Sequence, residues 1–220
     1  MNIRSKLTLT AAVSLAGLMS FVLGAEHPAP SVGADAALAK LKEGNARFAT
    51  SKMSSSKPTA AKRDETAQGQ HPFAIILGCA DSRTAPEIVF DQNIGDLFVI
   101  RTAGNLVDDH GLGSMEYAVE HLGVRLIVVM GHSRCGAVAA AVAGDSAPGH
   151  VQALVRDIQP AVKAVKGQSG DATELAVAAN ARLMADEIRT KVELGDLAKE
   201  VKIVPAVYDL ATGKVEWPKE

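Results

Sequence analysis

The sequence has little excess of charge of either sign, few cysteines and no internal repeat. Its 23 Lys and Arg residues nearly balance 25 Asp and Glu residues, which gives a formal net charge of −2. No basic patch stands out along the chain, so we expect neither nucleic acid nor an anionic membrane surface as a partner. Only 2 of the 220 residues are cysteine, which limits the chain to one disulfide.

A long uncharged apolar run occurs only near the amino end, over residues 7–23, and it is short for a membrane span. Two basic residues precede the run and the small residues Gly24 and Ala25 follow it. This pattern is typical of a secretory signal peptide. We therefore predict a signal peptide over residues 1–25, export to a bacterial periplasm and no membrane span after cleavage. An uncleaved anchor is the alternative. Without the signal peptide, residues 26–220 are predicted to form one domain of ordinary size.

Apolar runs without alternation predict strands that are buried on both faces. They cover residues 73–78, 97–100, 125–130 and 201–207. Pro205 favours an edge position for the last run. Helix-like segments cover residues 34–49, 58–67, 86–90, 113–122, 135–143, 151–165 and 172–194. This alternation predicts a single α/β domain, with a central, mostly parallel β-sheet flanked by helices and an N-terminal helical arm whose apolar face needs a cover.

Both cysteines follow predicted strands. Cys79 follows the first strand, while His132 and Cys135 follow the third. Ligand sites form at the carboxyl ends of parallel strands, and two thiolates with one imidazole are a known ligand set of catalytic zinc that leaves a fourth position for water. We therefore predict that Cys79, His132 and Cys135 bind one Zn²⁺ per subunit. A disulfide or a pair of buried free thiols is the alternative.

An acid and a base stand beside the first of these ligands, at Asp81 and Arg83. A purely structural zinc site would have no use for them. Asp81 can bind the metal as a fourth ligand or accept a hydrogen bond from water there. Arg83 can hold the carboxylate ionised and away from the metal through a charge-assisted pair. A solvated ion pair at a turn is the alternative.

These residues resemble those of the β-class carbonic anhydrases. The resemblance covers about residues 34–207. It rests on Cys79-x-Asp81-x-Arg83, on His132-x-x-Cys135, and on residues 90–105 and 111–136. It implies a catalytic domain over residues 26–220 that hydrates carbon dioxide reversibly to bicarbonate and a proton. It also implies a homodimer, or a tetramer of two dimers, in which the N-terminal helix wraps over its partner.

The same resemblance implies individual roles. Cys79, His132 and Cys135 would be the zinc ligands, and Asp81 and Arg83 the catalytic dyad. Gln70 would bind a substrate oxygen, Phe98 and Tyr117 would line the pocket from the partner subunit, and the main chain of Gly136 would face the substrate. From spacing alone, Phe98 and Tyr117 also fit core positions of a strand and a helix. Relatives that bicarbonate inhibits at a separate site carry Trp at the position of Ile76, which argues against that regulatory site here.

Two other functions remain open at this point. The first is hydrolysis of carbonyl sulfide or carbon disulfide at the same zinc site. The second is a noncatalytic module that binds zinc or bicarbonate. Such a module would have no need of Asp81 and Arg83, so the presence of both residues favours an enzyme.

Overall fold

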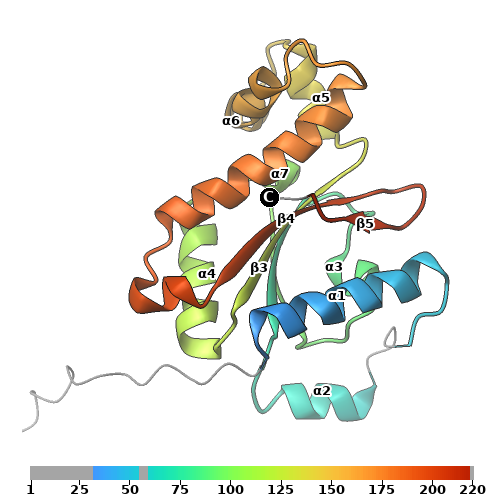
Figure 1. Ribbon diagram of the computed structural model, residues 1–220, viewed down its shortest axis with the longest axis vertical. Helices are drawn as coiled ribbons and strands as arrows, with labels where there is room; N and C mark the ends of the chain where they lie inside the picture. Colours follow the sequence, from blue (N-terminus) through green and yellow to red (C-terminus); the bar gives the residue numbers. More distant parts are fainter. Residues whose placement is uncertain (1–31, 55–58, 219–220) are drawn as a thin grey trace, which may run out of the picture.

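The computed structural model describes residues 32–54 and 59–218, so the predicted signal peptide lies outside the described residues. Figure 1 shows the arrangement of the helices and strands. In chain order they are α1 (Ala34–Ala49), α2 (Ala60–Thr66), β1 (Ala74–Gly78), α3 (Pro86–Val89), β2 (Leu97–Arg101), the 3₁₀ turn η1 (Ala103–Asn105), α4 (Asp109–Leu122), β3 (Leu126–His132), α5 (Gly136–Ala143), α6 (Val151–Ala164), α7 (Ala172–Lys191), the 3₁₀ turn η2 (Gly195–Lys199), β4 (Lys202–Tyr208) and β5 (Val215–Glu216).

One five-stranded sheet forms the centre, in the order β2-β1-β3-β4-β5. The pairs among β2, β1, β3 and β4 are parallel, and β5 pairs with β4 in the antiparallel sense. Gly78, at the end of β1, lies beside Arg101 of β2 and Met130 of β3. The segments that follow β1 and β3 therefore leave the same edge of the sheet. The predicted α/β class and mostly parallel sheet are confirmed.

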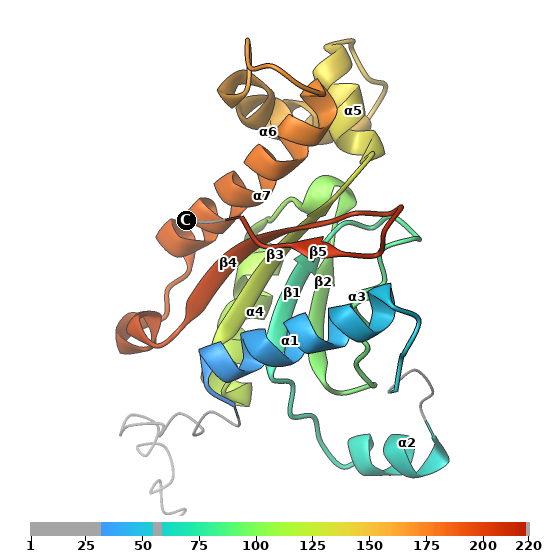
Figure 2. The same ribbon diagram turned by 45° about the vertical axis from the view of Figure 1, so that its right-hand side comes forward.

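The strands are apolar without alternation because helices cover both faces of the sheet. Ile76 and Val128 belong to the core beneath α1, whereas Ile75 and Ile127 belong to the core beneath α4 and α7. Figures 1 and 2 show α1 on one side of the strands and α4 and α7 on the other. In Figure 2, α5 and α6 stand with one end of α7 beyond the end of the sheet.

Helix α1 packs on the sheet of its own chain. Its Leu41 is fully buried in the same core as Val128. Gly44 allows the close approach, because a Cβ there would lie 1.8 Å from the carbonyl oxygen of Phe90. Asn45 is also buried and donates hydrogen bonds to the carbonyls of Val89 and Gly213 at 3.1 and 2.8 Å. The apolar face that the sequence predicts to need a cover is therefore covered by the sheet of the same chain, through long-range packing.

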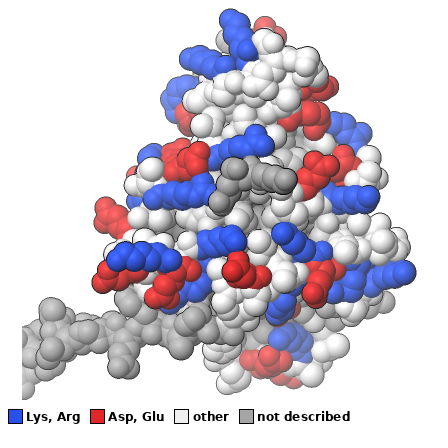
Figure 3. Space-filling view, in the orientation of Figure 1, with Lys and Arg blue, Asp and Glu red and all other residues white. Residues whose placement is uncertain are grey.

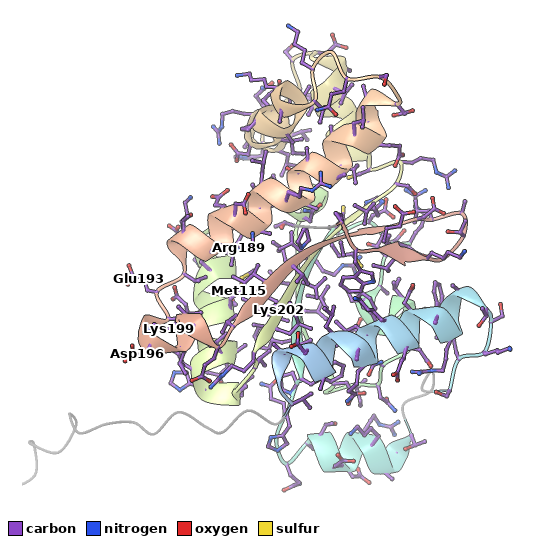
Figure 4. The ribbon with its side chains drawn as sticks, viewed as in Figure 1. Met115, Arg189, Glu193, Asp196, Lys199 and Lys202 are labelled. Atoms are coloured by element: carbon purple, nitrogen blue, oxygen red, sulfur yellow. The ribbon has the colours of Figure 1, made fainter. Side chains whose placement is uncertain are left out.

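Polar contacts tie the outer helices to β4. Arg189 of α7 donates a hydrogen bond to the carbonyl of Ile203, and Lys202 pairs with Asp35 of α1 at 2.8 Å. Figure 4 labels Arg189 and Lys202 near the middle of the view, where α7, β4 and α1 approach one another. The two helical layers are thus linked to the same strand from opposite sides.

Several predicted boundaries shift. Helix α4 begins at Asp109 rather than residue 113, because Asp108 caps it by accepting a hydrogen bond from the N–H of Gly111 at 2.8 Å. The edge position predicted from Pro205 holds only in part: β5 lies outside β4 but pairs with it only at Val207 and Tyr208. Pro205 itself pairs with β3 alone in the described ladder.

Charge is mixed over the visible surface. In Figure 3, Lys and Arg side chains are interspersed with Asp and Glu side chains, and uncharged surface lies between them. This agrees with the absence of a strong single-sign patch in the sequence. Among the residues that the structure describes, no helix combines the length and apolar character that crossing a bilayer requires.

Candidate metal centre

The two cysteines and His132 meet at the carboxyl edge of the sheet. Their ligand atoms all lie within 4.8 Å of one another, and all three residues are buried. Cys79 directly follows β1, His132 ends β3 and Cys135 precedes the first residue of α5. Both thiols are free. The disulfide alternative is therefore wrong, and the predicted cluster of metal ligands forms.

The histidine ring presents one nitrogen to this cluster. Nδ1 of His132 lies 3.0 Å from the carbonyl oxygen of Ser133, and because a carbonyl only accepts, Nδ1 carries the hydrogen. Nε2 is then a bare acceptor, buried and without a hydrogen-bond partner among the described residues. A buried polar atom of this kind needs a partner, and a second-shell bond to the other ring nitrogen is usual for a metal-binding histidine. The residues thus fit a metal ion.

The two thiols differ in their tendency to ionise. The hydrogen bond from Cys135 lowers the pKa of Cys79 to about 3, against the opposing effect of burial and with help from backbone N–H groups. The pKa of Cys135 is raised, because it donates to Cys79 and is buried. The hydrogen bond between the two sulfurs thus favours the thiolate at Cys79 over the thiolate at Cys135. A divalent cation that binds sulfur, such as Zn²⁺, would hold both cysteines as thiolates.

Asp81 and Arg83 form a bidentate ion pair beside the cluster. Arg83 donates from Nε to Oδ1 at 2.9 Å and from Nη2 to Oδ2 at 2.7 Å. These bonds hold the pKa of the Asp81 carboxyl well below its usual range. The same Oδ2 lies 3.9 Å from Nε2 of His132. One oxygen of this ion pair therefore lies close to the cluster of Cys79, His132 and Cys135.

The backbone that carries Cys79 and Asp81 is held by side chains that the sequence reading missed. Arg101 donates from Nε to the carbonyl of Cys79 at 2.8 Å and from Nη2 to that of Asp81 at 2.6 Å. Thr84 donates to the carbonyl of Cys79 at 3.2 Å. The sequence held a signal for Arg101, because it is the one charged residue of the otherwise apolar strand β2, and it lies at the same edge of the sheet as Cys79.

Contacts from helix α7 and from the segment after β4 support the loop between His132 and Cys135. Arg134 has a positive φ of 54°, and its N–H donates to Oε1 of Glu174 at 2.8 Å. Ser133 accepts a hydrogen bond from the N–H of Leu210 at 2.9 Å. The two contacts join residues that are 40 and 77 positions apart in the sequence, so no local sequence pattern predicts them.

Comparison with known proteins identifies the family. The carbonic anhydrase family model matches residues 74–215, which include every residue of the cluster. The chain belongs to the β-class carbonic anhydrases. A carbonic anhydrase of Mycolicibacterium smegmatis is 38% identical over 196 residues, covering 85% of this chain and 94% of that protein. Carbonic anhydrase 2 of Mycobacterium tuberculosis is 48% identical over 137 residues, which span 60% of this chain and 66% of that protein.

Solved β-carbonic anhydrases share the fold. A β-carbonic anhydrase of Aspergillus fumigatus superposes with a TM-score of 0.64 at 26% identity, covering 84% of this chain and 90% of that one. The Coccomyxa enzyme, solved in complex with acetazolamide, superposes with a TM-score of 0.63 at 27% identity, covering 82% of this chain and 85% of that one. The β-class assignment therefore agrees in sequence and in structure.

Gly136, whose main chain the resemblance places against the substrate, lies beside the cluster. It is the first residue of α5, adjacent to Cys135, and it is exposed. A Cβ built on it would meet nothing within 4 Å. Open space therefore lies directly beside one of the candidate sulfur ligands in this β-class carbonic anhydrase.

Gln70, Phe98 and Tyr117 do not join the metal ligands of their own chain. Gln70 is exposed and precedes the amino end of β1, whereas Cys79 follows the carboxyl end. Phe98 pairs in register with Ile75, four residues before Cys79, which is roughly 13 Å along the strand. Tyr117 is 47% exposed, so the core alternative is wrong for it. Gln70 and Phe98 therefore lie away from the cluster of their own chain, and could serve a metal centre only in a second copy of the chain.

Ile76, the departure from the family's bicarbonate-inhibited pattern, is fully buried. Its side chain belongs to the core beneath α1, together with Val128 and Val204. The position is thus occupied by ordinary apolar packing of the sheet.

Proposed function

We propose that this protein catalyses the reversible hydration of carbon dioxide to bicarbonate and a proton, with one Zn²⁺ per subunit held by Cys79, His132 and Cys135. The observation that carries the proposal is the bare, buried Nε2 of His132, which lies within 4.8 Å of two thiols and 3.9 Å from a carboxylate that an arginine holds ionised. Three protein ligands of this kind leave a fourth position for water.

When bound, zinc supplies a Lewis acid that lowers the pKa of water in the open position. Asp81 accepts a hydrogen bond from the attacking water and orients it toward carbon dioxide. Arg83 keeps Asp81 ionised and holds its two oxygens in a fixed direction. If Arg83 released the carboxylate, Asp81 would serve as a fourth ligand and close the site to water. The exposed main chain of Gly136 offers room for the substrate beside Cys135.

We further propose a homodimer, or a tetramer of two dimers, in which Gln70, Phe98 and Tyr117 complete the site of a second copy. The support is their position. Phe98 and Tyr117 lie 6.5 Å apart between ring centroids, on β2 and α4. Strand β2 ends the described sheet, so its outer edge is open to pairing. A second copy on this edge would bring apolar side chains to a pocket suited to a nonpolar substrate.

Export to the periplasm is also part of the proposal. It rests on the apolar run and the small residues that follow it within residues 1–25, which lie outside the described residues. Cell fractionation, with mass measurement of the amino terminus of the recovered protein, tests it. A protein recovered from the cytoplasm with residues 1–25 intact would contradict export.

Stopped-flow measurement of carbon dioxide hydration on metal-analysed protein tests the reaction. We expect about one zinc per chain and a rate that falls when a chelator removes the metal. Full zinc without hydration would favour the noncatalytic module. Faster hydrolysis of carbonyl sulfide or carbon disulfide, measured on the same sample, would favour the alternative enzyme.

A further inference from the structure

We propose that Asn180 is a positioning residue of the metal centre. It fixes Gly104 so that the N–H of Gly104 donates a hydrogen bond to the sulfur of Cys79. The inference rests on the proposed zinc site, because it assigns a residue that sets how one of the zinc ligands is held.

The contact runs from α7 through η1 to the end of β1. Nδ2 of Asn180 donates to the carbonyl oxygen of Gly104 at 2.8 Å, across 76 positions of sequence. The N–H of Gly104 donates to Sγ of Cys79 at 3.3 Å. Gly104 is thus held at both of its polar groups, by an amide on one side and by a metal-binding sulfur on the other.

Gly104 needs an outside restraint to keep this orientation. Its φ of 73° and ψ of 20° lie in the left-handed region, which glycine adopts without steric cost. A Cβ at this position would come within 2.8 Å of Cδ1 of Ile158, and the positive φ would strain any residue that carries one. Glycine is also the most flexible residue, and its N–H would point at Cys79 only part of the time without a partner on its carbonyl. Asn180 is that partner.

Packing alone does not explain an asparagine at position 180. The residue is 1% exposed, and its neighbours along the helix are Ala176, Ala179 and Ala181, all buried. Its Oδ1 has no hydrogen-bond partner among the described residues. A buried amide with one polar atom unsatisfied costs stability, and an apolar residue would avoid that cost. The bond from Nδ2 to Gly104 therefore accounts for the asparagine.

The consequence for the metal follows from the charge on sulfur. An N–H donor withdraws electron density from a thiolate and so changes how strongly that thiolate donates to a metal. Partners in this outer shell also orient the ligand before the metal arrives, and their removal typically weakens metal binding 10- to 100-fold. Asn180 thus acts on the metal through Gly104 and Cys79, without touching it.

The test compares Asn180→Ala and Asn180→Leu with wild type and with Asn45→Ala. Asn45 is a matched control, because it is a buried helical asparagine that donates to two carbonyls, but on α1 and away from the ligands. Each protein is loaded with Co²⁺ in place of zinc, and the thiolate-to-cobalt absorption band is recorded. Zinc affinity is then measured by competition with a chromophoric chelator, and folding by circular dichroism.

We expect both Asn180 variants to fold, to move the absorption band to longer wavelength and to bind zinc about 10- to 100-fold more weakly. Asn45→Ala should lose stability but keep the wild-type band and affinity. A band and affinity unchanged in the Asn180 variants would overturn the inference, as would shifts of equal size in Asn45→Ala. Asn180 variants that fail to fold, beside a folded Asn45→Ala, would show a structural residue and overturn it too. A wild-type protein without a thiolate-to-cobalt band would instead refute the zinc site itself.

Discussion

Asp81→Asn isolates the contribution of the carboxylate beside the metal ligands. The substitution keeps the shape of the side chain but replaces one acceptor oxygen with an NH₂ group and removes the charge. The new NH₂ would face a donor of Arg83, because Arg83 now donates to both oxygens at 2.9 and 2.7 Å. The bidentate pair therefore breaks, and the amide no longer offers an anionic acceptor beside Nε2 of His132.

The expected loss is large in rate and small in stability. A positioned group that accepts a proton or hydrogen bond in the transition state typically contributes 10²- to 10⁴-fold, which corresponds to about 2.7 to 5.4 kcal/mol of activation free energy. Stability should change little, because the Arg83 side chain is 53% exposed and solvent screens its pair with Asp81. Zinc should remain bound, since all three predicted ligands are untouched.

The assay is kcat/KM for carbon dioxide hydration by stopped flow, with zinc content and thermal unfolding measured on the same samples. Asp157→Asn is the matched control. Asp157 also forms a two-point pair with an arginine, Arg156, at 2.8 and 3.3 Å, but on the exposed surface of α6. We expect the control to keep wild-type kinetics.

Two results would refute the reasoning. Wild-type kcat/KM in zinc-loaded Asp81→Asn would show that the carboxylate takes no part in the reaction. An equal loss in Asp157→Asn would show that the effect is not specific to the site. Loss of zinc from Asp81→Asn would instead identify Asp81 as a ligand, and the rate would then report metal content.

Three further predictions follow from the same geometry. His132→Ala should lose zinc on dialysis, because two thiols alone hold the ion far more weakly, and stoichiometric zinc with wild-type activity would remove His132 from the ligand set. Gln70→Ala should lower kcat/KM for carbon dioxide hydration. Refolding this variant together with His132→Ala should restore activity in mixed dimers, because one of the two sites then has both an intact metal centre and an intact glutamine. No recovery of activity in confirmed mixed dimers would refute the shared site. Activity of the zinc-loaded protein should rise from about pH 7 toward about pH 9, because two thiolates offset the charge of Zn²⁺ and leave its water less acidic than in a three-histidine site. The ionisation of Asp81 should not change within this pH range, because the lowered pKa of its carboxyl keeps it ionised throughout. A flat pH profile with zinc fully bound would contradict the account.

The sequence alone was enough to predict the α/β class and the meeting of three side chains that could hold a metal ion. Unbroken apolar runs require cover on both faces, and parallel strands bring their carboxyl ends to one edge. Cys79, His132 and Cys135 each stand within a few residues of such an end, so their meeting follows from local pattern and a general rule of sheet topology. The pairing of Asp81 with Arg83 was also predictable, because the two residues are neighbours in the same loop.

Only the tertiary structure decided how the rest of the chain surrounds that cluster. It showed that α1 covers its own sheet, that Gln70 lies at the end of β1 opposite to the cluster, and that Tyr117 is exposed. It also revealed the bonds from Arg101 and Asn180, which reach across 22 and 76 positions. The periodicity of apolar residues records which side of an element is buried, but not which distant segment buries it. Single hydrogen bonds between distant segments form only when packing brings their atoms within about 3 Å, and no local spacing encodes that approach.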